Sequence, residues 1–502
     1  MTAESVLEET FSSISPAEFF YRNKQMAGFS NPTQAVYTVV RELVENSLDA
    51  CDTARQFPDV QVSVSNPVSD EVVITVSDNG TGVPHEQVPD AFGRILYGSK
   101  YSSRQRRGTF GLGVTMAVLY GQITTDSAAL IHTRPTNNEG REYRVLIDVQ
   151  KNEPIVDSVQ AKPRETPGTT VTIHMRGDSL RSRERIIEYL RLSAVGTPHA
   201  QILVNITDDF KDSFGPYDEL LPPLPQDNKP HPRSADVELL RRIIKSSPTK
   251  SLEELLVNSF QQLGRKRASK ILNFLNFSSR TNVSNLSRKE VALLSDGLRK
   301  FDGFGRPDSS CLSPIGKESF VKSVQASTNS EIIDYACTDP SDCDGFPFII
   351  EAVLATGEMF PTGKVPSLYR FANRVPLLYD PTEDVFSKVI RQLNWTRYGL
   401  DSGMRVAVYL HFCSTRVPYK AAGKQSIASA CNISEEALTL LRYLGRSLRK
   451  RVRTKRNAGR AERRMRKFES YFETIIESAA SLADIDHFPD SAHMVKSLFE
   501  VE

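Results

Sequence analysis

The segment RELVENSLDA, residues Arg41–Ala50, carries three polar side chains at helical spacing. Glu42, Asn46 and Asp49 are four and three residues apart, so a helix places them on one face. Valines and leucines between them predict that the rest of this helix is buried. A carboxylate one turn before an amide suits ATP hydrolysis, because the carboxylate can take a proton from water and the amide oxygen can bind Mg²⁺.

Two further segments offer what this chemistry also needs. Asp78 begins DNGTGV after an alternating, strand-like pattern, and an ionised carboxylate there can accept a proton from the adenine amino group. RRGTFGLG holds Gly108, Gly111 and Gly113 ahead of an apolar, helix-like run, and glycine lets backbone amides approach phosphate. Each feature alone is weak, since a helical carboxylate is usually solvated and DNG is usually a turn.

Other nucleotide-binding patterns fit less well. The chain has no GxxxxGK[ST] motif, and GEMFPTGKVPS has the wrong spacing with Val after Lys. GTGVPH lacks the third glycine of a dinucleotide fingerprint, and no HRD and DFG pair of a protein kinase is present. The ATPase interpretation therefore depends on several segments folding together.

The elements that must position these residues can be predicted along the chain. Asn31 and Pro32 form a helix start, and this helix runs to about Thr53. Alternating residues predict strands at 59–67 and 71–80, and GTT at 168–170 falls on a later strand. The 502 residues predict two to four domains. In order, the patterns indicate an α+β block closing near Asp227, a polar linker at 226–236, helices over 237–300, a second α+β block at 317–435 and one long helix from Glu435.

Composition narrows the class of protein. No run of 18 apolar residues predicts a membrane-spanning helix, and MTAESVLEETF lacks the apolar core of a signal peptide. The six cysteines never form CxxC, so reduced thiols are expected rather than a disulfide framework or a zinc site. The net charge is only +2, but residues 446–467 hold twelve Lys and Arg against one Glu. This cluster, with GRKRASK at Gly264–Lys270, indicates either solvated helix faces or surfaces that meet a polyanion.

Four motifs in order resemble those of the GHKL (Bergerat) ATPases: ELVENSLDA, SDNGTGV, GTFGLGV and GTT. By motif position, the resemblance implies that Glu42 is the general base, Asn46 the Mg²⁺ ligand and Asp78 the adenine contact. Residues Gly108–Thr115 would form the ATP lid, and Thr169 would support the adenine pocket.

Nearly the whole chain also resembles the B-subunit family of topoisomerase VI, a type IIB DNA topoisomerase. The likeness is carried by SPAEFFYRNKQMAGFSNP, VPDAFGRILYGSKY, RGTFGLGVTMAVLY, LNWTRYG and CSTRVPYKAAGKQSIA. It implies a multidomain α+β protein with a Bergerat-fold ATPase domain and N-terminal strap (1–227), a helix-two-turns-helix domain (228–306), a transducer domain of the ribosomal protein S5-like α/β type (307–435) and a long basic C-terminal helix and tail (436–502).

This closer resemblance adds residues to the site. Lys424 in AAGKQS would reach the γ-phosphate from the transducer. The remaining nucleotide-binding positions implied are Gly80, Gly82, Ser99, Lys100, Gly108, Thr109, Phe110, Gly111, Leu112, Gly113, Val114 and Thr115. Two residues depart from the family pattern. Relatives often have Lys at the positions of Thr115 and Thr396, and Thr396 belongs to WTRY (Trp395–Tyr398). Loss of the second charge predicts a weaker DNA contact at WTRY, or one shifted to Arg397.

The implied function is the ATP-hydrolysing clamp subunit of a DNA topoisomerase. ATP and Mg²⁺ are the expected cofactors, and two copies would dimerise through the ATPase domains with SPAEFF exchanged between them. The A subunit would complete a heterotetramer of two A and two B subunits and cleave double-stranded DNA, in the cytoplasm and associated with the nucleoid. The alternatives are a MutL-like repair ATPase, which should lack the helical insert and the basic terminal helix, and a chaperone or binding module without catalysis, against which Glu42 and Lys424 argue.

Overall fold

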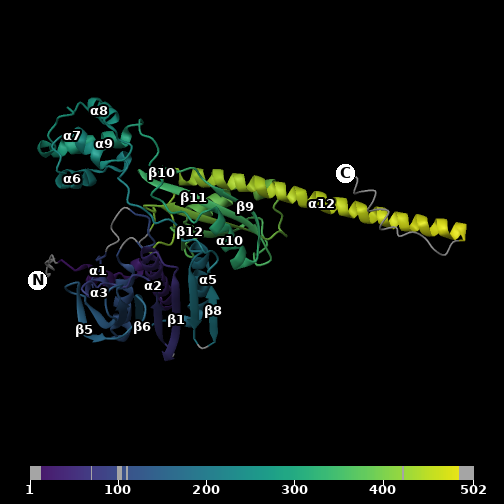
Figure 1. Cartoon of the computed structure of the whole chain (residues 1–502), viewed down its shortest axis with the longest axis horizontal. Coiled ribbons are helices and arrows are strands. Elements are labelled where there is room, and N and C mark those ends of the chain that lie inside the picture. The colour runs from purple at the N-terminus through teal and green to yellow at the C-terminus, as the bar shows by residue number, and fades with distance from the viewer. Residues whose placement is uncertain are drawn as a thin grey trace, which may run out of the picture.

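The computed structural model describes residues 13–68, 70–98, 104–108, 111–207, 209–420 and 423–484. An eight-stranded sheet with its helices forms the first α+β block, and a six-stranded sheet forms the second. A block of short helices lies beside them, and the helix α12 (Ile433–Ala483) extends away from all three (Figure 1). The mixed α/β class and the long C-terminal helix that the sequence predicts are both confirmed.

The first sheet has the strand order β5-β4-β3-β6-β2-β1-β7-β8, and only the β1–β7 pair is parallel. Buried and half-buried residues alternate along β2, as the pattern EVVITVS predicts. The strands are β1 (Asp59–Val68), β2 (Glu71–Ser77), β3 (Ala129–Arg134), β4 (Arg141–Asp148), β5 (Glu153–Ala161), β6 (Gly168–Arg176), β7 (Gln201–Ile206) and β8 (Phe210–Phe214).

The helix α2 (Pro32–Ala54) is the central helix of this block. Asn31 caps it, because its side chain accepts a hydrogen bond from the amide of Gln34 at 2.8 Å. Fourteen of its residues are buried, which is more than a single apolar face would bury. The reason is that α2 also packs against α4 and α5. The other helices of the block are α1 (Pro16–Arg22), η1 (Lys24–Ala27), α3 (Val88–Gly93), α4 (Gly113–Thr125) and α5 (Ser179–Gly196).

The segment SPAEFF packs against the first α+β block of its own chain. Ser15 caps α1 and donates a hydrogen bond from its hydroxyl to the carbonyl of Val149 at 2.5 Å, and Ala17 is buried. Exchange of this segment between two copies stays a prediction.

Residues 235–304 contain an independent apolar core, built around Leu255, Ile271 and Leu294. The helix α9 begins with a capping box in which Ser287 and Glu290 satisfy each other's amides. The helices of this block are η2 (Pro232–Ser234), α6 (Val237–Ser246), α7 (Leu252–Ser259), α8 (Arg265–Phe274), η3 (Val283–Asn285) and α9 (Arg288–Lys300).

The second sheet has the order β10-β11-β14-β12-β13. In addition, β9 pairs with Glu351–Thr356 of β11, along the edge opposite β14. In the segment RVPLLYD, only Val375 and Pro376 form a strand. Proline cannot donate to a ladder, although the next amide, that of Leu377, still donates to the carbonyl of Arg370 at 2.8 Å. The elements are α10 (Lys317–Thr328), β9 (Glu331–Cys337), β10 (Ser341–Cys343), β11 (Phe346–Thr356), β12 (Ser367–Ala372), β13 (Val375–Pro376), α11 (Val385–Gln392), η4 (Trp395–Tyr398) and β14 (Val406–Ser414).

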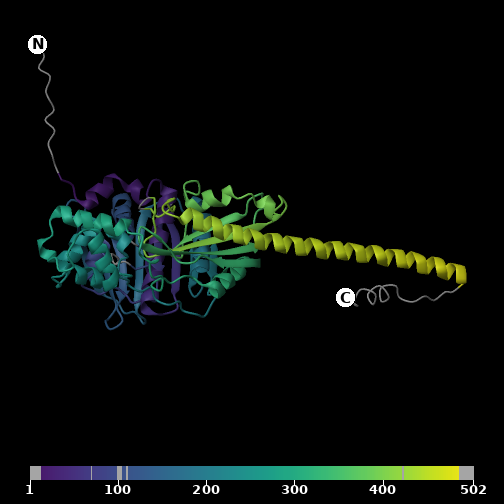
Figure 2. The ribbon, with the colours of Figure 1, turned by 90° about the horizontal axis from the view of Figure 1, so that it is seen from above.

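The 51 residues of α12 span about 75 Å at the usual helical rise. Its first turns bury Leu440, Leu444 and Leu448 against the second sheet, and beyond them the helix projects from the body (Figure 2). Among the described residues, no helix combines the length and the hydrophobicity that crossing a membrane requires.

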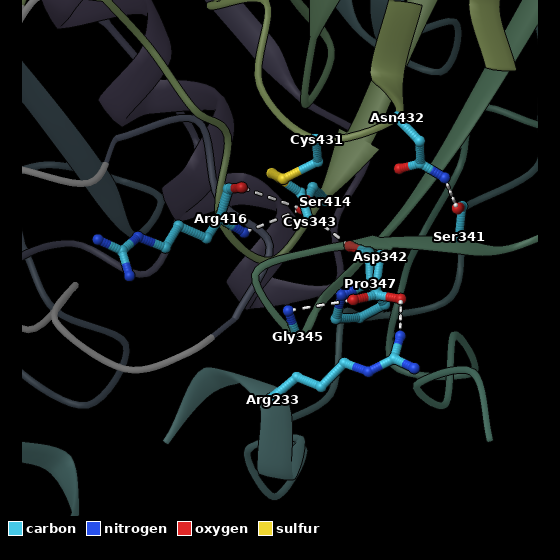
Figure 3. The surroundings of a disulfide bond; sticks show 10 residues. All are labelled: Arg233, Ser341, Asp342, Cys343, Gly345, Pro347, Ser414, Arg416, Cys431 and Asn432. Carbon is cyan, nitrogen blue, oxygen red and sulfur yellow. Dashed lines mark hydrogen bonds and ion pairs between the residues drawn. A yellow bond between two sulfur atoms is a disulfide. The ribbon is translucent and has the colours of Figure 1, made fainter. Parts of the chain in front are cut away.

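A disulfide joins Cys343, at the end of β10, to Cys431, just before α12. The expectation that all thiols are reduced is therefore wrong; residues 88 positions apart meet only once β10 and the start of α12 are folded together. Figure 3 shows the neighbouring bonds: Asn432 donates to the hydroxyl of Ser341 at 2.7 Å, and Asp342 pairs with Arg233 at 3.4 Å. The other four cysteines are free thiols.

We expect that reduction lowers the thermal midpoint of the protein. Cross-linking across 88 residues constrains the unfolded chain by on the order of 4 kcal/mol in the chain-entropy model. Cys431→Ser should abolish the response to reductant, whereas Cys337→Ser, which removes an exposed free thiol, should retain it. Calorimetry with and without dithiothreitol measures the effect. Six reactive thiols in the unfolded, unreduced protein would contradict the bond.

Candidate active site

One cavity of about 660 Å³ collects most of the residues singled out by sequence. Glu42, Asn46 and Asp49 lie on its wall, as their spacing along α2 predicts. Lys424, almost four hundred residues further along the chain, lies on the same wall. The other predicted residues on the wall are Asp78, Gly82, Gly108, Gly111, Leu112, Gly113, Val114 and Thr169.

Glu42 and Lys424 of the cavity wall belong to a buried cluster of two cations and two carboxylates. Arg41 contacts Glu42 directly and lies 3.5 Å from Glu45, and it donates to the carbonyl of Gly423 at 2.8 Å. Lys424 Nζ lies 2.8 Å from Glu45 Oε2 and 3.9 Å from Glu42 Oε2. Burial alone would lower the pKa of Lys424, but Glu42 and Glu45 raise it above its usual value, so the ammonium stays charged.

Asp78 lies just beyond β2 and is 6% exposed. Its carboxylate accepts hydrogen bonds from the Ser47 hydroxyl at 3.0 Å, the Gly80 amide at 2.9 Å and the Thr169 amide at 3.2 Å. Burial raises its pKa, and the three donors offset this only in part. These bonds hold the side chain in one orientation at the cavity wall, while Thr169 itself contacts the Thr133 hydroxyl at 3.1 Å.

The first turn of α4 meets Glu42. A Cβ at Gly113 would lie 1.7 Å from Glu42 Oε2, so only glycine fits between this turn and the carboxylate. Leu112, the N-cap residue, has an apolar side chain and makes no capping bond to the first-turn amides. An uncapped helix start beside Asn46 and Lys424 favours a phosphate group, which fits the predicted nucleotide. Gly82 is needed for a separate reason: its φ is +68° and a Cβ would meet the carbonyl of Arg134.

Some predicted residues lie elsewhere. Gly80 does not line the cavity among the described residues. It packs against Ala50 of α2, and its amide donates to Asp78 and so orients that side chain. Thr115 is buried and donates from its hydroxyl to the carbonyl of Leu112 at 3.1 Å, so its side chain turns back into the helix. Ser99, Lys100, Thr109 and Phe110 lie outside the described residues.

Sequence reasoning missed several charged residues in and beside the cavity. Glu45 pairs with Lys424. It lies within ELVENSLDA, which assigns it no role, and its spacing of three from Glu42 was the available signal. Arg107, which directly precedes Gly108, is 4% exposed and pairs with Asp49 at 3.0 Å and Asp52 at 2.6 Å. Although burial acts to raise it, the pKa of Asp52 is held well below its usual range, with Arg107 the main opposing influence. Asp49 is thus bound to an arginine at the edge of the cavity.

We expect ATP binding to weaken as the pH falls. The loss should begin at a higher pH than the titration of an exposed aspartate would produce. The folded pKa of Asp78 is raised, so its carboxylate takes up a proton sooner as the pH falls, which would remove the acceptor predicted for the adenine amino group. Asp78→Asn should weaken binding about tenfold or more at neutral pH, the value of one hydrogen bond to a charged group, and should flatten the pH dependence. Calorimetric titration from neutral to mildly acidic pH measures this. Asp212→Asn, an exposed change on β8, serves as the control; equal pH profiles for both variants would contradict the assignment.

Two family models match the chain. Residues 31–178 match the histidine kinase-, DNA gyrase B- and HSP90-like ATPase family, and residues 307–464 match the topoisomerase VI B subunit transducer. The first match contains α2, Asp78 and the start of α4, and the second contains Lys424 and the start of α12. The two families therefore meet at the cavity.

Curated relatives are similar over almost the whole chain. The B subunit of type 2 DNA topoisomerase 6 from Saccharolobus islandicus is 37% identical over 484 residues, which cover 94% of this chain and 91% of the relative. The protein of the same name from Saccharolobus solfataricus is 36% identical over 480 residues, with the same coverage. Because this likeness includes the helical block and the basic helix as well as the ATPase block, it also decides against the MutL-like alternative. The chain belongs to the family of type 2 DNA topoisomerase 6 B subunits.

Proposed function

We propose that this protein is the ATP-binding and ATP-hydrolysing clamp subunit of a type IIB topoisomerase, in which nucleotide binding closes a dimer around one DNA duplex. The observation that carries the proposal is Lys424. It comes from the second α+β block, yet it lies in the cavity of the first, beside Glu42 and Glu45. A bound nucleotide can therefore act on the orientation of both blocks.

The cavity residues divide the chemistry between them. Glu42 takes a proton from the attacking water, and Arg41 fixes its carboxylate. Asp78 binds the adenine amino group, while the first-turn amides of α4 and the adjoining glycines hold the phosphates. Asn46 supplies an oxygen ligand to Mg²⁺, which when bound neutralises phosphate charge. The two cations of the cluster, Arg41 and Lys424, are balanced by the two carboxylates of Glu42 and Glu45. Without a nucleotide, no buried charge of the cluster is therefore left uncompensated, and an anionic ligand can still bind to the cations.

Lys424 acts as the switch between nucleotide states. A terminal phosphate beside α4 competes with Glu42 and Glu45 for its ammonium, and the competitor is lost when the phosphate leaves. The difference between ATP and ADP at this one cation biases how the two blocks are oriented. A charge-assisted contact of this kind contributes about 1.5–3 kcal/mol.

The remaining assignments follow the family. Residues 1–227 form the ATPase domain with its strap, 228–306 a helix-two-turns-helix domain, 307–435 the transducer, and 436–502 the arm that contacts the A subunit. ATP-driven dimerisation and a heterotetramer with two A subunits, which cut the DNA, complete the enzyme, in the cytoplasm at the nucleoid. Exposed arginines of α12 at 446–467 support contact with DNA. In WTRY, Trp395 is buried and only Arg397 offers an exposed cation, which supports a contact shifted to that residue.

Glu42→Ala should lose roughly 10²–10⁴-fold in ATP hydrolysis while it still binds ATP, because the carboxylate acts on water. In the complex with the A subunit, decatenation of linked DNA circles should require ATP for wild type and fall with hydrolysis in the variant. Glu184→Ala, an exposed change on α5, is the control. If wild type with the A subunit and ATP does not decatenate DNA, the clamp function is wrong.

Lys424→Ala should lose hydrolysis and strand passage together while ADP affinity stays near that of wild type. Small-angle scattering of the dimer with a non-hydrolysable ATP analogue and then with ADP should show a change of shape for wild type and none for the variant. Removing one buried charge leaves Glu45 with Arg41 alone, 3.5 Å away, and breaking a buried pair costs about 3–5 kcal/mol. The double variant Lys424→Ala with Glu45→Gln therefore separates lost switching from lost folding.

Lys420→Ala is the matched control, because Lys420 is a nearby lysine that is partly exposed and pairs with Glu383. It should retain the change of shape. A nucleotide-dependent change that persists in the folded double variant would mean that another contact links the two blocks to the nucleotide.

A further inference from the structure

The turn between β12 and β13 extends from the second sheet to the cavity of the first block. Its two residues, Asn373 and Arg374, have φ of +47° and +71°. Two successive left-handed residues are uncommon outside glycine, and such a backbone persists only where its surroundings hold it. Both side chains are more than nine-tenths buried, and both line the cavity that holds Glu42 and Lys424.

The second sheet holds this turn rigidly. The amide of Arg374 donates to Nε2 of His411 at 3.0 Å, and Nδ1 of His411 lies 2.8 Å from Glu351. The hydrogen-bond pattern therefore places the histidine proton on Nδ1. Glu351 is fully buried, and its carboxylate also accepts from two backbone amides and the Tyr335 hydroxyl. The Asn373 side chain exchanges two hydrogen bonds of 2.9 Å with the backbone of Ser414.

Across the boundary, the turn reaches the three residues that precede the glycine-rich lid segment, directly at Arg106 and otherwise through Ser313 and Asp52. Asn373 Nδ2 donates to the carbonyl of Arg106 at 3.1 Å. Gln105 exchanges hydrogen bonds of 2.9 and 2.7 Å with the backbone of Ser313, whose hydroxyl accepts from Arg374 at 2.8 Å. We call residues 105–107 the lid stem.

Asp52 of α2 joins the same contact. The guanidinium of Arg374 lies 3.9 Å from the Asp52 carboxylate, which Arg107 of the lid stem binds at 2.6 Å. Arg374 Nε is buried and has no hydrogen-bond partner among the described residues. None of these residues belongs to the Lys424 cluster, and Asp52 lies seven residues, or about 10 Å of helix, beyond Glu45.

We propose that Asn373 and Arg374 are positioning residues through which the transducer sets the lid stem, and so determine how firmly the lid retains any adenine nucleotide. The inference rests on the proposed ATPase function. It differs from the Lys424 switch in one respect: the turn is connected to the lid stem and Asp52, whereas Lys424 is connected to Glu42 and Glu45. Lys424 separates ATP from ADP, whereas the turn affects both nucleotides alike.

The test uses the full chain in complex with the A subunit. Asn373→Gly removes the side chain and keeps the left-handed backbone without strain. It should weaken ADP and the non-hydrolysable ATP analogue by the same factor, about tenfold, and raise KM for ATP more than it lowers kcat. Trypsin cleavage after Arg104, Arg106 or Arg107, followed by mass spectrometry, should become faster with either nucleotide bound.

Asn329→Gly is the matched control, because Asn329 has the same φ of +47° at the exposed end of α10. It should match wild type in affinity and in cleavage. Arg374→Lys keeps the positive charge, and trypsin can still cleave after residue 374, but the planar guanidinium is lost. This variant should weaken nucleotide affinity and speed trypsin cleavage of the lid stem as Asn373→Gly does, but by less. This second variant decides the question if Asn373→Gly does not fold.

The outcomes separate this inference from the proposed function. If wild type binds and hydrolyses ATP and the folded turn variants match it in affinity and cleavage, the inference is wrong and the function stands. A lowered thermal midpoint with unchanged affinity reveals a purely structural turn and also overturns it. A loss confined to the ATP analogue would assign the turn to the Lys424 switch. If wild type binds no adenine nucleotide, the proposed function fails and the inference fails with it.

Discussion

The buried ion cluster of Arg41, Glu42, Glu45 and Lys424 is the interaction on which the rest of the arrangement depends. Two carboxylates on α2 cannot be buried at low cost unless cations meet them, and only one of the two cations comes from the same helix. The other, Lys424, has to arrive from the second α+β block, from the segment between β14 and α12. The charge balance of a single helix thus favours one relative orientation of the two blocks, which also share an apolar core between α5 and the second sheet.

This requirement links stability to ligand binding. A buried pair contributes little net stability against an apolar replacement, whereas removal of one partner is costly. An anionic ligand at the uncapped start of α4 offers Lys424 another partner of the same charge as Glu45, so the exchange leaves no buried cation unpaired. The cluster is therefore suited to change its connections while the fold persists. Gly113 makes this possible, because any side chain there would collide with Glu42.

The second connection between the blocks is of a different kind. Around Asn373 and Arg374 the contacts are mostly hydrogen bonds to backbone, and Glu351 and His411 fix them from inside the second sheet. Such bonds have strict geometry and offer no alternative partner of like charge. One of these two links between the blocks can thus exchange partners, whereas the other holds its register.

The sequence by itself determined the local structure. Asn31 and Pro32 set the start of α2, the alternation in EVVITVS set β2, and the spacing of Glu42, Asn46 and Asp49 set their common face, because these depend on residues near in the chain. Only the tertiary structure decided which distant partners meet. Lys424 with Glu45, Arg107 with Asp52, Asn373 with Arg106 and Cys343 with Cys431 all lie tens to hundreds of residues apart. Neither periodicity nor propensity encodes such pairs, because they form only once distant segments of the chain are folded against each other.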